Sequence, residues 1–293
     1  MKNISIFCFG FGQVAKNFIK KLQLENININ LNVTTTNKTE QKKIYGLSYN
    51  SYFFNGEKYD DQIINKLKES DHVLVSIPPI NGTDVVIKNF SKIIKESNLK
   101  WITYLSATSV YGNHNGNWVN EESQTIPTSS NGINRLIAEK SWLNLASKEN
   151  IPIQIFRLSA IYSEKNNLLV RLKLGNINLI NKENQFFSRI YVDDIANILF
   201  NSLTNFKTKE IFNISDDKPA STKEILIYGV KLLNIQLPKT LELEDIKNSM
   251  LKNFYKDSKK VSNKKMKTFF SYKLKYPTYV EGLSYIRNNF SKL

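Results

Sequence analysis

Strand-length apolar runs and segments with helical spacing alternate along the first 160 residues of the chain. The N-terminal run Ile4 to Phe9 has the length of a strand and leads, through a turn, into helical spacing from Lys16 to Leu22. Further strands are predicted over 29–35, 71–77, 101–105 and 153–157, and helices over 60–69, 85–96 and 135–148. This alternation predicts right-handed crossovers and a parallel sheet with helices on both faces.

Beyond residue 160 the pattern is less regular. The segment Ser188 to Ala196 leads into a helix that ends at Leu203, and Ile211 to Ile214 has the pattern of a strand. A second helix is predicted from Ser221 to Leu233, with Ser221 as its N-cap because a serine hydroxyl can accept a hydrogen bond from the first helical turn. We find neither an internal repeat nor a flexible linker.

The turn after the first strand, Gly10-Phe11-Gly12-Gln13-Val14-Ala15, has the form of a phosphate-binding turn. Gly10 permits the tight turn, Gly12 lets the backbone approach a pyrophosphate, and the N–H groups of the following helix would face the phosphates. We therefore expect an α/β fold with a Rossmann-type doubly wound parallel sheet. Residues 1–160 would form the dinucleotide-binding domain, and residues 161–293 would complete the sheet and form a smaller C-terminal substrate lobe.

The composition is that of a globular protein. Hydrophobic residues make up 41% of the 293 residues, and no apolar run approaches the ~20 residues that cross a bilayer. Because the first apolar run is already a strand, a signal peptide is not expected, and the expected location is the cytoplasm. The single cysteine, Cys8, excludes an internal disulfide and is predicted to be a core side chain.

The net charge of +15 could indicate a nucleic-acid partner. Lysines are spread along the chain beside abundant Asn and Ile, however, and only the run from Lys252 to Lys267 is dense. No DNA- or RNA-binding motif accompanies that run. We interpret the charge as solvated surface, expect no membrane or nucleic-acid partner, and leave a homodimer open.

Landmarks in a fixed order give the chain a resemblance to a known superfamily. They are Gly10 to Ala15, Leu105 to Gly112, Arg135 to Glu139, Arg157 to Tyr162, and Arg189 to Ala196. The chain resembles the extended short-chain dehydrogenase/reductase superfamily, of the epimerase/dehydratase kind. More narrowly, residues 118–122, 213–220 and 276–283 are similar to an atypical bacterial branch of NAD(P)-binding proteins.

The resemblance implies a catalytic set that this chain has replaced. The superfamily uses a Tyr as proton donor, a Lys four residues later, and a Ser or Thr near the end of the preceding strand. Alignment on the landmarks places Asn131 at the tyrosine position, Arg135 at the lysine position and Ala107 at the hydroxyl position. Asn131 has no proton to give near neutral pH, whereas Arg135 could still hold ribose hydroxyls.

Two side chains in the loop after the Val-Tyr-Gly landmark are candidate substitutes. Tyr111 lies where the superfamily often contacts substrate, and His114 titrates in the useful range. The resemblance then implies an NAD(P)-binding epimerase/dehydratase-like oxidoreductase acting on a small polar substrate. The alternative is a catalytically silent NADP(H)-binding sensor or scaffold protein. The landmarks also make Arg189 a candidate substrate contact and Asp193 a candidate turn anchor.

The end of the second strand bears on the choice of cofactor. An acidic residue there would pair with the ribose hydroxyls of NAD, but Val33 to Lys38 contains no carboxylate. Threonine hydroxyls and Lys38 could instead hold a 2′-phosphate, which favours NADP over NAD. The expected cofactor contacts are Gly10, Gly12, Gln13, Val14, Thr35, Lys38, Pro78 and Arg135. No metal-ligating set is expected.

Overall fold

The computed structural model describes residues 3–180, 182–247 and 255–290. Lys252, at the start of the dense lysine run, lies outside the described residues. The chain forms two compact units, each built from separate stretches of sequence. Unit 1 comprises Met1–Ala107, Ser130–Arg157 and Ile195–Phe212, and unit 2 comprises Thr108–Ser129, Leu158–Asp194 and Asn213–Leu293.

A mostly parallel sheet is the centre of unit 1, as the sequence predicted. Its strand order is β12-β8-β6-β5-β1-β2-β4-β3. The bounds are β1 Asn3–Phe9, β2 Asn28–Thr35, β3 Glu40–Ile44, β4 Leu47–Phe53, β5 His72–Val75, β6 Trp101–Ala107, β8 Ile153–Leu158 and β12 Ile211–Ile214. Strand β1 pairs in parallel with both β2 and β5, so the carboxyl ends of these three strands lie at one edge.

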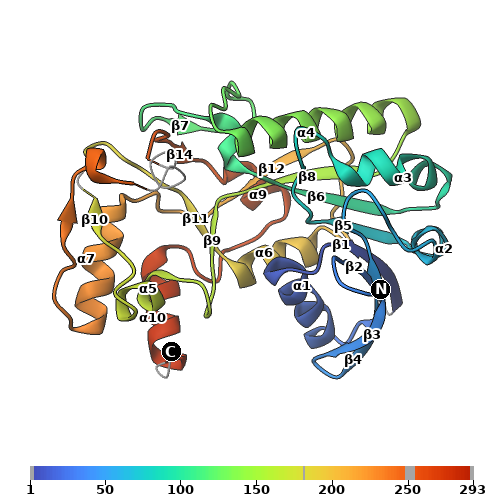
Figure 1. Cartoon of the computed structure of the whole chain (residues 1–293), viewed down its shortest axis with the longest axis horizontal. Helices are drawn as coiled ribbons and strands as arrows, with labels where there is room; N and C mark the ends of the chain where they lie inside the picture. The colour runs from blue at the N-terminus through green and yellow to red at the C-terminus, as the bar shows by residue number, and fades with distance from the viewer. Residues whose placement is uncertain (1–2, 181, 248–254, 291–293) are drawn as a thin grey trace. The chain divides into compact units, whose positions relative to one another are not determined.

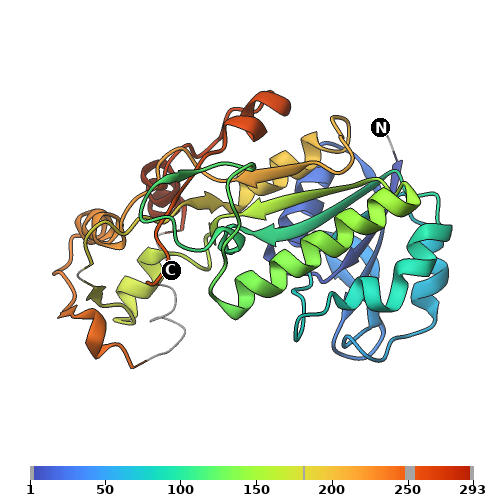
Figure 2. The same ribbon diagram turned by 90° about the horizontal axis from the view of Figure 1, so that it is seen from above.

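Helices cover both faces of this sheet (Figures 1 and 2). They are α1 Gln13–Leu24, α2 Gln62–Lys68, α3 Val85–Glu96, α4 Ser130–Glu149 and α6 Val192–Asn201. Helices α3 and α4 lie on one face, and α1 and α6 lie on the other. The core under α3 and α4 contains Phe7, Phe9, Phe90 and Trp142, all fully buried. The doubly wound arrangement is therefore confirmed.

Two elements of unit 1 differ from the sequence prediction. Helix α4 begins at Ser130, one turn earlier than the predicted start at Arg135. The β3–β4 hairpin was not predicted at all. Its two-residue turn consists of Tyr45 and Gly46, both with positive φ angles, of 48° and 80°. A tyrosine rarely adopts this conformation, so the sequence carries no ordinary turn signal there.

Unit 2 consists of short strands and helices. Its elements are η1 Thr108–Tyr111, β7 Trp118–Val119, β9 Ala160–Tyr162, α5 Leu168–Lys173, β10 Leu179–Ile180, β11 Arg189–Tyr191, α7 Thr222–Leu233, β13 Thr240–Leu241, η2 Leu243–Asp245, β14 Lys260–Val261, α9 Lys264–Phe269 and α10 Tyr279–Asn289. Strands pair as β9–β11, β7–β14 and β10–β13. Helix α7 contacts both α5 and α10. The predicted N-cap is confirmed, because the Ser221 side chain accepts from the Glu224 N–H at 3.0 Å.

Candidate functional site

The glycine turn at the carboxyl end of β1 is held rigidly by its neighbours in unit 1. Gly10 has a φ of +85°, and a Cβ there would lie 2.8 Å from Ser76 Oγ. The Gly10 N–H donates to Thr34 Oγ1 at 2.8 Å, and the Ser76 hydroxyl lies 3.0 Å from the carbonyl oxygens of both Phe9 and Gly10. The turn is thus fixed to β2 on one side and to the end of β5 on the other.

The N-terminus of α1 fits an anionic group such as a pyrophosphate. Gly12 is the N-cap, no side chain caps the helix, and the first turn contains no acidic residue. A Cβ on Gly12 would meet nothing within 4 Å, so the backbone is open on that side. Gln13 is exposed, whereas Val14 is only 6% exposed and packs into the core. Val14 can therefore contribute only its backbone N–H to a bound phosphate.

The remaining predicted cofactor contacts lie in loops that follow β2 and β5. Thr35 ends β2, its hydroxyl accepts from the Asn37 N–H at 3.2 Å, and Lys38 is exposed. Pro78 is exposed in the loop after β5. Because β1, β2 and β5 are parallel, these loops share the sheet edge with the glycine turn. Their contact with a cofactor stays a prediction.

The usual catalytic positions of the superfamily are brought together only in part. Asn131 is exposed in the first turn of α4, and Arg135 lies one turn later. The Arg135 guanidinium donates to the Leu105 carbonyl, so it reaches the end of β6, where Ala107 is the last residue. The alignment is compatible with this geometry, and the assignment of the three positions stays a prediction.

A buried tyrosine beside Arg135 does not replace the missing proton donor. Arg135 Nη1 lies 3.4 Å from the Tyr104 hydroxyl, and Tyr104 is fully buried. Burial raises the pKa of Tyr104, with the nearby Arg135 charge opposing that effect. Tyr104 therefore keeps its proton at neutral pH and has no solvent-exposed surface through which to deliver it.

The landmark Arg157 forms a buried ion pair rather than a binding site. Its guanidinium donates to Glu139 at 2.7 Å, and the two side chains are 5% and 2% exposed. The Ser106 hydroxyl donates to the same carboxylate at 2.5 Å. This cluster ties α4 to β8 and β6, which explains its place among the landmarks by packing alone.

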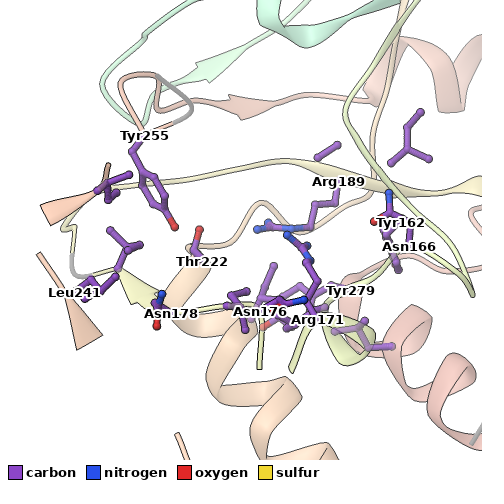
Figure 3. Close-up of a pocket in the computed structure, with 18 of the residues that line it drawn as sticks. Tyr162, Asn166, Arg171, Asn176, Asn178, Arg189, Thr222, Leu241, Tyr255 and Tyr279 are labelled. Atoms are coloured by element: carbon purple, nitrogen blue, oxygen red, sulfur yellow. The ribbon is translucent and has the colours of Figure 1, made fainter. Parts of the chain in front are cut away.

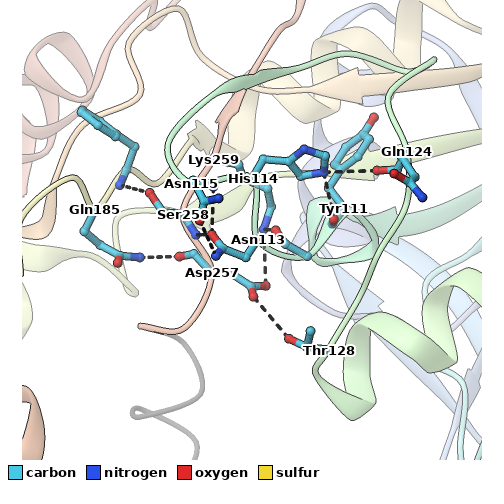
Figure 4. Close-up of polar contacts among 12 residues, drawn as sticks. Tyr111, Asn113, His114, Asn115, Gln124, Thr128, Gln185, Asp257, Ser258 and Lys259 are labelled. Carbon is cyan, nitrogen blue, oxygen red and sulfur yellow. Dashed lines mark hydrogen bonds and ion pairs between the residues drawn. The ribbon is translucent and has the colours of Figure 1, made fainter.

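The two candidate substitutes, Tyr111 and His114, lie in unit 2. Tyr111 is fully buried and donates to Asn213 Oδ1 at 2.7 Å, which gives its hydroxyl a structural role. His114 Nε2 lies 3.1 Å from the Tyr111 carbonyl oxygen and 3.2 Å from that of Gln124 (Figure 4). Because both partners only accept, Nε2 must carry the proton, and Nδ1 is left as the acceptor of the neutral ring. Their catalytic roles stay predictions.

A cavity of ≈ 630 Å³ lies within unit 2, between β9, β11, α5, α7 and the start of α10. Arg171 and Arg189 both line it, and their side chains point toward one another (Figure 3). Apolar side chains such as Leu168, Ile225 and Leu241 form much of the lining, and several elements add polar ones: Tyr162, Asn166, Asn176, Asn178, Thr222, Tyr255 and Tyr279. Asp245 and Lys247, both exposed, add one charge of each sign to the lining.

Among the residues that the structure describes, no carboxylate lies at ion-pair distance from the two arginines of this cavity. Arg189 Nη1 donates to the carbonyls of Phe187 at 2.8 Å and Ala220 at 3.1 Å, which are neutral acceptors. Burial is the main reason that the pKa of Arg189 is lowered to about 10; the Asp216 charge opposes this shift and the Arg171 charge adds to it. At neutral pH Arg189 is therefore protonated and poorly solvated, a state that an anionic ligand would relieve.

The Asp216 carboxyl interacts electrostatically with Arg189. Asp216 is 1% exposed, and its burial raises its pKa well above the usual range despite the nearby Arg189. Its Oδ2 has no hydrogen-bond partner. Burial thus disfavours the charged form of this carboxyl beside Arg189.

Sequence reasoning found one of these cavity residues and missed the rest. Arg189 was a candidate through its landmark, but Arg171, Tyr255 and Tyr279 come from unrelated segments with no shared spacing. The structure alone brings them together. Across the described ranges, His, Cys, Asp and Glu do not gather in threes that could hold a metal, and no helix there is long and apolar enough to cross a membrane.

Comparisons with known proteins define the class of fold. A functionally unknown conserved protein from Silicibacter pomeroyi is 28% identical, covers 98% of this chain and 99% of its own, and superposes with a TM-score of 0.86. UDP-glucuronic acid 4-epimerase from Bacillus cereus, solved with UDP-glucuronic acid and NAD, is 17% identical, with 99% of each chain covered and a TM-score of 0.78. dTDP-glucose 4,6-dehydratase from Bacillus anthracis, solved with NAD, is 17% identical, covers 100% and 97%, and has a TM-score of 0.76.

Residues 85–215 match the model of the NAD dependent epimerase/dehydratase family. The chain therefore has the fold of epimerases and dehydratases, and the resemblance drawn from the sequence landmarks is confirmed. No curated protein matches the sequence. These comparisons give no support to the alternative of a catalytically silent sensor or scaffold.

Proposed function

We propose that the chain is an NAD(P)-dependent oxidoreductase of the epimerase/dehydratase kind, acting on an anionic substrate related to a sugar nucleotide. The observation that carries the substrate class is the pair of arginines facing each other in the unit 2 cavity. Two guanidinium groups that point into one cavity, with no ion-pair partner among the described residues, match the forked geometry of a phosphate or pyrophosphate. The tyrosines in the same lining offer flat surfaces for a base or sugar.

The named relatives support this substrate class. The Bacillus cereus epimerase was solved with UDP-glucuronic acid, and the Bacillus anthracis enzyme acts on dTDP-glucose. Both ligands carry a pyrophosphate between a nucleoside and a sugar. A cavity of ≈ 630 Å³ is within the size range of sites that bury such molecules.

Unit 1 would hold the cofactor at the glycine turn. The backbone N–H groups at the start of α1 would bind the pyrophosphate, and Arg135 would donate to ribose hydroxyls. The bound nicotinamide would take up or release a hydride. Lys38 and the threonines at the end of β2 favour NADP over NAD. The segment Val33 to Lys38 contains no carboxylate, and a carboxylate would repel a 2′-phosphate.

The proton transfer in this reaction must involve a residue other than Asn131. We assign it to His114: two carbonyls fix its Nε2–H, so Nδ1 is the atom that would accept the substrate hydroxyl proton during oxidation and return it in the reverse step. Tyr111 is the second candidate, although its hydroxyl would first have to leave Asn213. His114→Gln should therefore slow turnover more than Tyr111→Phe does.

The direct test is a binding and turnover assay on the purified chain. We expect UDP-glucuronic acid and UDP to bind in titration calorimetry, and neutral glucose not to bind. Arg189→Gln should weaken UDP binding by about 10-fold to 100-fold while leaving NADP binding intact. Formation of reduced cofactor on mixing NADP⁺ or NAD⁺ with the sugar nucleotide would establish the oxidoreductase activity. Binding of glucose but not of UDP would contradict the proposed substrate class.

A further inference from the structure

We propose that Lys259 is a positioning residue that holds the loop from Gly112 to Thr128 in the shape the reaction requires. This inference rests on the proposed function, because the loop carries His114. The contacts behind it form one cluster within unit 2 (Figure 4). They join the loop to the short segment Tyr255 to Lys259, which is more than a hundred residues away in sequence.

The side chains of Lys259 and Asp257 bind both ends of the loop. Lys259 Nζ donates to the Gly112 carbonyl at 2.8 Å and lies 3.5 Å from Asp257 Oδ2. The other oxygen of Asp257 accepts from Thr128 Oγ1 at 3.4 Å. The Lys259–Asp257 pair therefore fixes the point where the loop leaves η1 and the point where it approaches α4.

The backbone of Ser258 binds the middle of the same loop. Its carbonyl accepts from the N–H groups of His114 and Gly116, both at 3.0 Å, and its N–H donates to Asn113 Oδ1 at 3.0 Å. Because His114 is held by its own backbone and by its ring, its orientation depends on the position of Ser258. A shift of the segment 257–259 would move the imidazole directly.

Holding the turn at Gly112 with a lysine requires that a charged ammonium group be desolvated. Its side chain is 12% exposed, and burial lowers the pKa of Lys259 while Asp257 raises it. An apolar side chain would fill the same space without desolvating a charge. What the ammonium adds is a directed donor to the Gly112 carbonyl, at a glycine whose Cβ would lie 2.0 Å from the Ile126 oxygen.

The same segment also reaches the proposed substrate cavity. Tyr255 lines that cavity, and Lys182 donates to its carbonyl. Gln185 donates to the Asp257 carbonyl, and Ser258 Oγ donates to the Asn184 carbonyl at 2.7 Å. Within unit 2, one rigidly bonded segment thus links a wall of the cavity to the loop that carries His114.

The test compares Lys259→Met with Lys259→Arg and with a matched control, Lys267→Met. Lys267 also pairs with an aspartate, Asp217 at 2.9 Å, but it is 39% exposed and lies outside the loop contacts. Each variant is measured for hydrogen exchange at the His114 and Gly116 amides, and for turnover with UDP-glucuronic acid and NADP⁺ or NAD⁺.

We expect Lys259→Met to accelerate exchange across residues 112–128 and to lower kcat by about 10-fold to 100-fold, because a displacement near 1 Å suffices for such a loss. KM for UDP-glucuronic acid should change less than about twofold, since the cavity side chains are untouched. Lys259→Arg should restore most of kcat, and Lys267→Met should match the unchanged protein.

Three results would overturn the proposal: unchanged exchange in the loop, faster exchange with unchanged kcat, or a KM effect that accounts for the whole loss. Asp257→Asn serves as a second variant if Lys259→Met does not fold. It should also accelerate exchange in the loop and lower kcat, but both effects should be smaller. If the unchanged protein reduces no cofactor with the probe, the proposed function fails and the reaction role of Lys259 falls with it. The exchange measurement still reports separately whether the lysine holds the loop.

Discussion

The glycine turn of unit 1 and the arginine cavity of unit 2 both favour anions, but they do so with different groups. At the glycine turn the attraction comes from backbone N–H groups and the helix dipole, and no charged side chain is needed. In the cavity it comes from two guanidinium groups, one of them half-buried and bonded to carbonyl oxygens. The first site depends on what is missing, a Cβ on Gly12, and the second on what is present, a charge on Arg189.

This difference determines how each site fails. Added bulk blocks the glycine turn without disturbing the fold, because Gly12 has open space around it. Loss of charge at Arg189 would disable the cavity. Larger side chains at exposed lining positions such as Asn176 and Asn178 would be tolerated, because solvent surrounds them. The comparison therefore predicts opposite responses to steric and electrostatic substitutions at the two sites.

The largest expected effect is that of Gly12→Val. The side chain would occupy the space through which a pyrophosphate approaches the α1 N-terminus, so NADP and NAD should each bind at least about 100-fold more weakly. Titration calorimetry measures the loss, and thermal unfolding should show a nearly unchanged Tm. Full cofactor binding by this variant would contradict the assignment of the glycine turn.

Gly10→Val is the matched control for steric bulk at the same turn. Its φ of +85° and a Cβ only 2.8 Å from Ser76 Oγ make any side chain strained there. This variant should lose stability as well as binding. The two glycines, two residues apart, would then separate a folding requirement from a binding requirement.

Arg189→Gln tests the electrostatic side of the comparison. Removing a charge-assisted hydrogen bond from a buried site should weaken UDP binding by about 10-fold to 100-fold. Arg171→Gln should have a smaller effect, because Arg171 is more exposed than Arg189. NADP binding should stay unchanged in both variants, as measured by calorimetry. Equal effects on UDP and NADP would break the division of roles between the units.

The large sheet could be predicted because its information is local. The run Ile4 to Phe9 became β1, and Cys8 within it is fully buried as expected. The β3–β4 hairpin could not be predicted, because Tyr45 adopts a positive φ that favours Asn, Asp or Gly. The first turn of α4 was also missed, since Ser-Ser-Asn-Gly is typical of a turn and only packing makes it helical.

The two sites differ in the same way. The glycine turn is one continuous motif, so its residues could be named from spacing alone. Arg171, Tyr255 and Tyr279 come from α5, a loop and α10, and no sequence spacing relates them. Tyr162 and Tyr279 lie within landmark segments, but among these cavity residues the landmarks made Arg189 the candidate substrate contact. A site assembled by tertiary contacts between distant segments leaves no pattern along the chain.

A smaller effect is expected at Lys38. This lysine is exposed, so its attraction for a 2′-phosphate is weakened by solvent and salt. Lys38→Ala should reduce the preference for NADP over NAD by about threefold to fivefold and leave NAD affinity unchanged. Calorimetry with both cofactors at low and high salt is the measurement. Equal affinity for both cofactors in the unchanged protein would remove the reason for assigning Lys38 to the phosphate.

The smallest expected effect is a decrease in the free energy of unfolding of unit 1 at low pH, without a matching loss in the unit 2 cavity. His72 begins β5, at the opposite end of that strand from the glycine-turn edge, and it is 4% exposed. Burial lowers the pKa of His72 below its ordinary value near 6.5, with Asp71 opposing and Lys100 reinforcing that shift. The unfolded chain therefore binds a proton more readily than the folded one. The contribution of His72 to the free energy of unfolding should be fully present above about pH 6.5. It should be lost as the pH falls toward the lowered pKa of His72.

Urea unfolding between about pH 8 and about pH 5 measures this dependence. His72→Gln removes the titrating group and should flatten the acid side of the profile. His114→Gln, which changes the other histidine of the chain, should leave the slope in place. Hydrogen exchange at the lower pH should show the loss first in β1, β5 and β6, the strands around His72, while the amides around Arg189 stay protected. Simultaneous loss in both places would show that the two units unfold as one, and the comparison between their sites would then hold for binding alone.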